Sequence, residues 1–446
     1  MPVVAKMIFR SLVLFPRRVL MGLAMALPIT AMAAAPHQPW PLQRVLQTVA
    51  ENAPAILAAR AGIIEAKAHV GQARSHWFGS VDLYAIDTHY NVPMLIEPIT
   101  SFPPPKTFGK KFARNQLAYG IEAKLPLDFS LRIAAEVDAA RAAERATRWN
   151  ARNVELQTLL TASAVYRNLQ ALDGKRVALE EELKALRQAE ATARGSLQAG
   201  LSTRLKLLRV QSGVEKVRAA IAGVNGKIAS LKADLASLMG LDAWAGNVMP
   251  LTTPPASMPG GEGVAPFVQA AEQANAATGY KMSAAKRALL PQFFIAARFN
   301  QNGRHDFHDD FYTRAIQFGF KWNLWSGFGQ MSAIDAAQAA HIQASEKARG
   351  ARLKLTSIRA SARARWHAES LAWEANRAEV AAAKEAAGSA RGQFKAGLLT
   401  ATSLLQAEAV LAGARAAETA TLARWWEAND ALRYAEGLPP MTVRTR

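Results

Sequence analysis

The residue types best suited to chemistry stand together in one short run, His305-Asp306-Phe307-His308-Asp309-Asp310. Imidazole and carboxylate groups are common metal ligands, and the spacing of His305 and His308 allows two imidazoles to bind one ion. Such residues are equally ordinary in a solvated loop, and we favour that interpretation. Elsewhere the sequence has no catalytic constellation and no phosphate-binding motif such as G-x-x-x-x-G-K-[ST]. We therefore predict no catalytic, cofactor or metal site and no enzyme activity.

The composition indicates an ordered protein with a large core, because half of the 446 residues are hydrophobic and a fifth are charged. Basic residues precede the apolar run 19–32, so residues 1–33 are predicted to be a secretory signal cleaved after Ala33. An uncleaved anchor is the alternative, although the run is short for a membrane helix. The sequence has no cysteine, which excludes disulfides and a lipid-modified cysteine. Export makes nucleic acid an unsuitable partner despite the net charge of +19.

One passage of the sequence occurs twice. Residues 193–241 align without a gap on residues 390–438, and Ala199-Gly200-Leu201 coincides with Ala396-Gly397-Leu398. The repeating unit is much longer than a solenoid repeat, which predicts two copies of one module. A segment rich in proline and glycine separates the copies. The expected boundaries are a first repeat at 34–241, a linker at 242–263, a second repeat at 264–438 and a basic tail at 439–446.

Proline positions show where long helices can run, because proline breaks helix interiors. None occurs between Pro126 and Pro250 or between Pro291 and Pro439. In the first interval, residues 131–196 are strong helix formers, and apolar residues then recur every three or four positions over 207–238. This line of apolar residues, called the seam below, predicts a left-handed coiled coil. The second interval, about 331–390 and 400–435, is richer in alanine, whose small side chains let helices approach closely, so we expect this half to pack differently.

Gly200 and Gly397 interrupt the two long helical stretches at the same point of the repeat. Glycine suits a left-handed helix cap and a tight reversal into an antiparallel partner. Each module is therefore predicted to end in a helical hairpin whose turn is Ala-Gly-Leu.

Each hairpin follows sequence with a period of two. Apolar and polar residues alternate over 117–127 and 314–325, with partner strands expected at about 80–90 and 292–301. Such alternation is typical of membrane barrel strands with one face toward lipid and one toward a wet lumen. A half-buried sheet in a soluble domain is the alternative, but aromatic residues such as Phe318 argue against it.

A sheet in lipid cannot leave an edge, because unpaired backbone groups are costly in hydrocarbon. Four strands are too few to close, since the smallest bacterial barrels have about 8. Several chains must therefore share one barrel, and strand counting alone allows two, three or four copies.

The order of motifs resembles the TolC family of outer-membrane efflux proteins over essentially the whole mature chain. Ala50-Glu51-Asn52-Ala53-Pro54 precedes a strand hairpin, a long helix, the Gly-Leu turn and a helix ending at Leu241. The same order recurs around residues 288–292 and 320–329. No single motif is as specific as a metal-ligand signature, but another fold would hardly produce the same motifs in this duplicated order.

The resemblance implies a mostly α fold with a small β part, in two tandem repeats of a β-hairpin plus a long antiparallel helical hairpin. It also implies a homotrimer whose twelve-stranded outer-membrane barrel continues into an α-helical barrel across the periplasm. The two turns are then the periplasmic tip, where the family meets its adaptor. The tip residues are Gly200, Leu201, Lys206, Gly397, Leu398 and Ser403.

The chain departs from the family at this tip. In well-known members the sixth residue after the turn glycine is an aspartate of an acidic constriction, whereas here it is Lys206 or Ser403. Together with Arg204 and Arg209, Lys206 indicates a basic entrance. The alternative is that these basic side chains lie on the outer, solvated face.

The predicted function is a passive outer-membrane channel-tunnel, surrounded by outer-membrane lipid. It would export drugs, metal ions or other toxic solutes received from an inner-membrane pump, of RND or ABC type, through a periplasmic membrane-fusion adaptor. One alternative is a periplasmic coiled-coil scaffold or adaptor without a barrel, which would not need the aromatic strands. A basic nucleic-acid-binding helical protein is another, and it conflicts with the signal.

Overall fold

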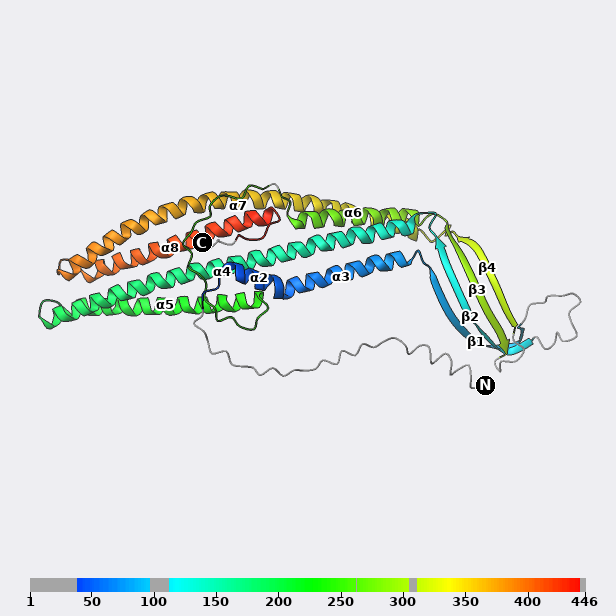
Figure 1. The fold of residues 1–446 in the computed structure, drawn as a ribbon, viewed down its shortest axis with the longest axis horizontal. Coiled ribbons are helices and arrows are strands. Elements are labelled where there is room, and N and C mark those ends of the chain that lie inside the picture. The colour runs from blue at the N-terminus through cyan, green and yellow to red at the C-terminus, as the bar shows by residue number, and fades with distance from the viewer. Residues whose placement is uncertain (1–37, 97–111, 262, 305–310, 442–446) are drawn as a thin grey trace, which may run out of the picture. The chain divides into compact units, whose positions relative to one another are not determined.

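Long helices and one sheet make up the chain from Pro39 onward (Figure 1). The computed structural model describes residues 38–96, 112–261, 263–304 and 311–441. The predicted signal at 1–33, the His305/His308 run and the end of the predicted tail, 442–446, lie outside the described residues. The elements in chain order are α2 (Leu42–Asn52), α3 (Pro54–Ser75), β1 (Ser80–Leu95), β2 (Phe112–Leu127), α4 (Arg132–Gln198), α5 (Arg204–Leu238), α6 (Pro266–Arg287), β3 (Gln292–Arg304), β4 (Phe311–Lys321), α7 (Gly329–Lys395) and α8 (Ala401–Ala435).

The structural repeat extends further than the sequence repeat. Helices α4 and α7 both have 67 residues, and α5 and α8 both have 35. The residues just before α4 and α7, Leu131 and Phe328, both adopt a left-handed conformation, with φ of 56° and 65°. Non-glycine residues rarely adopt it. The two modules therefore share their strand-to-helix junctions as well as their turns.

The four strands form one antiparallel sheet in the order β1-β2-β3-β4, so β1 and β4 are its edges within the described chain. The strand predicted at 314–325 is wrong at its end, because β4 stops at Lys321. Lys321 pairs with Gln292, the first residue of β3, and the preceding Pro291 has no N–H to continue the ladder. Trp322 instead donates its indole N–H to the Leu289 carbonyl at 2.9 Å.

The helices pack as two successive layers along α4. Near the sheet, α4 lies between α3 and α6, and α6 packs on α7; beyond α6, α4 lies between α5 and α8, and α8 packs on α7. The predicted seam of α5 is present, with Val210, Val214, Val217 and Val224 buried. The residues that α7 buries are mostly alanines. The two hairpins therefore differ in what they bury, with valines on α5 and mostly alanines on α7.

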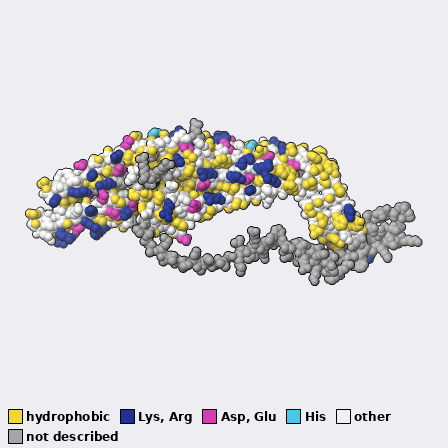
Figure 2. Space-filling view, in the orientation of Figure 1, with side chains coloured by type: hydrophobic (Ala, Val, Ile, Leu, Met, Phe, Trp, Pro, Cys, Tyr) yellow, Lys and Arg dark blue, Asp and Glu magenta, His cyan; other side chains and the backbone are white. Residues whose placement is uncertain are grey.

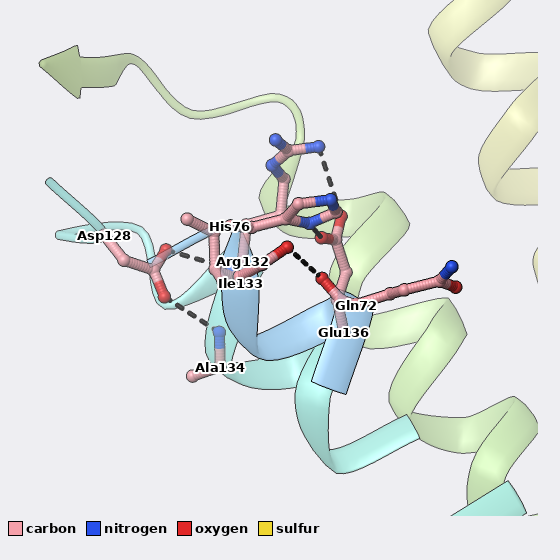
Figure 3. Close-up of polar contacts among 8 residues, drawn as sticks. Gln72, His76, Asp128, Arg132, Ile133, Ala134 and Glu136 are labelled. Atoms are coloured by element: carbon pink, nitrogen blue, oxygen red, sulfur yellow. Dashed lines mark hydrogen bonds and ion pairs between the residues drawn. The ribbon is translucent and has the colours of Figure 1, made fainter. Parts of the chain in front are cut away.

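Side chains from three elements fix the first junction between strand and helix (Figure 3). The Asp128 carboxylate accepts hydrogen bonds from the backbone N–H groups of Ile133, at 3.1 Å, and Ala134, at 2.8 Å. These are donors that the first turn of α4 leaves without helical partners. Glu136 pairs with His76 at the end of α3, at 3.4 Å, so the ends of both helices are joined beside the sheet.

Candidate functional site

The first helical hairpin reverses through a glycine cap. Gly200 has φ of +72°, a conformation that glycine adopts without the steric cost of a Cβ. Its N–H donates to the Leu197 carbonyl at 3.0 Å, and the Leu201 N–H donates to the Ser196 carbonyl at 2.8 Å. These two hydrogen bonds form the Schellman motif, which provides donors for the last carbonyls of α4. The Thr203 hydroxyl then caps α5 by accepting from the Lys206 N–H at 3.4 Å.

The second hairpin uses the same devices. Gly397 has φ of +80°, and the Leu398 N–H donates to the Gln393 carbonyl at 2.9 Å. Thr400 caps α8 by accepting from the Ser403 N–H at 3.2 Å, and the two hydroxyls lie 2.9 Å apart. Ser403 therefore completes a helix cap, whereas its counterpart Lys206 extends a long basic side chain from an equivalent position.

The two turns are brought together by a shared core between the hairpins. Phe394, Leu404 and Val210 are buried in it, with alanines from α4 and α7. Beyond this core Leu201 and Leu398 are 83% and 80% exposed. Two apolar side chains thus project from the end of the helices, where nothing else in the described chain covers them.

Basic side chains surround this tip. The Lys206 ammonium lies 4.3 Å from the centre of the Phe394 ring, a cation–π contact that links α5 to α7. Arg204 and Arg209 are exposed on α5. Neither α5 nor α8 has an acidic residue in its first turn. The predicted basic residues are therefore clustered at the tip without neighbouring carboxylates in those turns.

Above the tip, charged groups lie within the second hairpin and at its boundary with the first. Arg391 donates to both carboxylate oxygens of the buried Glu408, at 2.5 and 2.6 Å. Burial, with the negative charge of Glu408, raises the pKa of Glu182 on α4. Arg415 on α8 pairs with Glu181 on α4. Polar contacts therefore join the two modules along their boundary.

The sheet at the opposite end of the helices has one apolar and one polar face. Leu83, Ile121 and Phe299 occupy paired positions on one face, and Figure 2 shows hydrophobic side chains gathered over the strands. On the other face, Arg298 pairs with Glu122 at 2.8 Å, and the Tyr84 hydroxyl donates to the side-chain amide oxygen Oδ1 of Asn300 at 3.0 Å. This division fits strands between lipid and a wet lumen.

A buried polar network, which no sequence motif predicts, lies between the modules. The Asp430 carboxylate of α8 accepts from the Ser163 hydroxyl of α4 at 2.7 Å and from the Met441 N–H at 2.9 Å. Arg167 is buried beside it and donates to the Gln170 side chain at 3.1 Å. Burial raises the pKa of Asp430 and lowers that of Arg167, and the opposite charges offset both effects.

The segment between α5 and α6, residues 239–265, crosses the helices and is called the connector below (Figure 1). Its Met249 carbonyl accepts from the Gln170 side chain at 2.7 Å, and its Thr253 carbonyl accepts from the Trp426 indole at 2.9 Å. Helix α2 packs on α4 beside it, in a core that includes Tyr166 and Trp244. The connector is thus fastened to one face of both α4 and α8.

The described residues contain no group of three or more metal-ligating side chains that could hold an ion. The His305/His308 alternative lies outside them. In the part of the chain that the structure covers, no helix has the length and apolarity needed to cross a membrane.

The family model for outer membrane efflux proteins matches residues 45–241 and 264–438. The chain belongs to the outer membrane efflux protein family. No significant match was found among curated protein sequences. Solved structures with the same fold include the outer membrane protein VceC of Vibrio cholerae, at 18% identity and a TM-score of 0.75 over 90% of this chain and 100% of that one. The CmeC outer membrane channel of Campylobacter jejuni gives 14% identity and a TM-score of 0.76, over 89% and 85% of the two chains. The open state of the MtrE outer membrane channel of Neisseria gonorrhoeae gives 17% and 0.71, over 89% of each chain.

This outer membrane efflux protein is therefore a channel of the TolC family, with a periplasmic helical extension. Channels of the family are homotrimers in tripartite efflux systems and are not enzymes. Trimerisation gives the edge strands β1 and β4 partners in a shared barrel. The periplasmic scaffold and nucleic-acid-binding alternatives are wrong, because neither describes a chain of this family.

Proposed function

We propose that this channel conducts drugs, metal ions or other toxic small solutes delivered by an inner-membrane pump of RND or ABC type. A periplasmic membrane-fusion adaptor would dock at the tip formed by Gly200, Leu201, Gly397 and Leu398. The two leucines carry the proposal, because both are exposed at the same end of the helices, on turns of identical sequence, where they offer an apolar contact to a partner. The glycine caps hold both leucines on turns of defined conformation, so docking would cost little conformational entropy.

Site-specific crosslinking in cells tests the adaptor contact. Cysteines placed at Ala199 and Ala396, both exposed at the turns, are expected to capture the same periplasmic adaptor. A cysteine at Ala68, exposed on α3 near the sheet, is the matched control and should not capture it. The chain has no native cysteine, so each variant carries a single reactive thiol. Equal capture from Ala68 and the turns would contradict docking at the tip.

We further propose that Arg204, Lys206 and Arg209 form a basic entrance that favours anions. Positive charge near a helix N-terminus is opposed by the helix dipole by about 0.3–1 kcal/mol. The Phe394 ring offsets part of this cost for Lys206. A basic side chain at the start of α5 is thus unfavourable for the helix itself. We take this as support for a role in which its charge acts on solutes that pass the entrance.

Ion selectivity of the reconstituted channel tests this entrance. Lys206→Asp should move the reversal potential in a salt gradient toward cation preference, most strongly at low ionic strength, where charges are least screened. Lys227→Asp makes the same charge change on α5, more than five turns from the tip, and should have a smaller effect. A wild-type channel that prefers cations and is unchanged by Lys206→Asp would rule out a basic entrance.

A further inference from the structure

The C-terminal third of α8, around residues 424–431, is enclosed on three of its sides. Toward α4 it presents Asp430, bonded to Ser163, and toward α7 it presents Trp425, whose ring lies 5.3 Å from that of Trp366. A third side carries Trp426, which donates to the connector. In an α-helix, residues three and four apart share a face. The fourth side therefore carries Arg424, Glu427 and Ala431, away from the connector.

A groove of about 420 Å³ lies on this fourth side, between α7 and α8. Arg365 and Glu369 of α7 line it together with Arg424 and Glu427 of α8. Arg424 binds Glu369 through its Nε at 3.0 Å, and Glu427 forms no ion pair with another side chain among the described residues. One carboxylate oxygen of Glu427 is buried and has no hydrogen-bond partner among the described residues. The groove is thus lined by a cluster of charged groups, and one of them, the Glu427 carboxyl, has an oxygen without a hydrogen bond in the described chain.

The position of the connector identifies which face of the helices borders the channel. The connector and α2 cover one face of α4 and α8, where Met249, Thr253 and Tyr166 make their contacts. In a homotrimer three connectors on the inner face would obstruct the passage that a channel must keep open. The connector therefore lies on the outer, periplasmic face, and the groove on the opposite side of α8 faces the lumen.

We propose that the groove around Glu427 forms a charge-selective ring in the lumen, midway along the helical tunnel, whose net charge depends on whether Glu427 is protonated. Its ligands are charged solutes in transit. The proposal rests on the channel function proposed above. It concerns a different part of the molecule from the basic tip.

The surroundings of Glu427 explain why its charge is adjustable. Burial raises the pKa of Glu427 to about 7; the positive charges of Arg424 and Arg167 oppose this rise, and the negative charges of Asp430 and Glu369 add to it. Arg365 of α7 also lines the groove. With Glu427 protonated, two arginines face one carboxylate, and each subunit contributes a net positive charge. With Glu427 ionised, the groove is neutral. Three subunits make this change three times around one lumen.

The chain offers a matched pair of substitutions. Glu427→Gln is nearly isosteric and keeps the neutral form at every pH, so it preserves the packing of the protonated groove. Glu418→Gln makes the same change on α8 nine residues earlier, which is about half a turn away around the helix. Glu418 therefore lies on the side opposite Glu427, away from the lumen.

The test measures reversal potentials of the purified trimer in planar bilayers, in a potassium chloride gradient at pH 6 and pH 8. The wild type should become more cation-preferring as the pH rises. Glu427→Gln should remove most of this change and hold the wild-type pH 6 value at pH 8, whereas Glu418→Gln should titrate like the wild type. If the reversal potential of Glu427→Gln changes with pH as much as that of the wild type, the proposed ring is wrong. A wild type that forms no channels would instead contradict the conduit function.

A second measurement tests the placement without relying on titration. In a cysteine-free chain, Ala431→Cys should react with a charged methanethiosulfonate reagent added to open channels and reduce their conductance. Glu418→Cys should leave the conductance unchanged after the same treatment. Block at Glu418→Cys but not at Ala431→Cys would place the groove on the outer face and overturn the proposal.

Discussion

The tip residue Lys206 and the groove residue Glu427 illustrate how this chain places charge where local structure disfavours it. Lys206 lies in the first turn of α5, at the positive end of the helix dipole, and its ammonium contacts the Phe394 ring. Glu427 is largely buried beside Asp430. Structural ion pairs also shift pKa values, but an incompletely satisfied group bordering a passage is a functional candidate.

Glu427 should make the stability of the protein depend on pH. Its pKa is about 4.5 in the unfolded chain and about 7 in the folded one. Between these values the folded state keeps a proton that the unfolded state has lost, so stability falls as the pH rises from 4.5 to 7 and is level above. Glu427→Gln should therefore match the wild type at pH 4.5 and exceed it at pH 8, by on the order of 2 kcal/mol per subunit.

The midpoint of thermal unfolding of the detergent-solubilised trimer measures this difference. Glu418→Gln, on the opposite side of α8, serves as the control and should not change the pH dependence. A Glu427→Gln variant that is less stable than the wild type at pH 8 would show that the ionised carboxylate is a stabilising group.

Much of the element order was predictable from local patterns. The three-and-four spacing of α5, the turn glycines and the absence of proline located both helical hairpins, whose observed ends differ by a few residues from those predicted. Helices α3 and α6 were not predicted, although both begin at a proline, Pro54 and Pro266, in the first helical turn. That position tolerates proline because its N–H has no helical partner.

The candidate sites differ in how far the sequence can reveal them. The tip depends on glycines and caps within a few residues of each other, so its geometry follows from local sequence. The network of Ser163 and Asp430 joins residues 267 apart, and the groove at Glu427 unites α7 with α8. Such sites arise from which helix faces meet, and spacing along one helix does not specify that.

Helix packing between the modules depends on a glycine in α4. A Cβ added at Gly174 would lie 2.6 Å from Cγ2 and 2.9 Å from Cβ of Thr419 on α8. Gly174→Ala should therefore destabilise the trimer by about 1–3 kcal/mol, as overpacking does, despite the better helix propensity of alanine.

Gly195→Ala is the matched substitution in the same helix, where a Cβ meets nothing within 4 Å in the described chain. It should stabilise α4 by up to about 1 kcal/mol. Thermal unfolding of both variants compares them directly. If Gly174→Ala is as stable as Gly195→Ala, the close approach of α4 and α8 does not limit stability.

At the scale of the assembled trimer, the barrel joins three sheets whose edges have no partner within one described chain. Each sheet must present its apolar face to lipid and its polar face to water, because the two faces alternate residue by residue. Adjacent residues of β4 therefore have opposite environments. Phe318 is exposed on the apolar face, near Phe293 and Phe320, whereas Gln317 lies on the polar face.

Lysine substitutions at these two neighbours test the orientation of the whole barrel. Phe318→Lys should cost up to about 2–4 kcal/mol if the residue lies near the bilayer midplane, and Gln317→Lys should be tolerated in the wet lumen. The measurement is the amount of heat-dissociable, SDS-resistant trimer in the outer-membrane fraction, which should fall for Phe318→Lys alone. The reverse ranking would mean that the aromatic face of the sheet points inward, and the assignment of lipid and lumen faces would have to be exchanged.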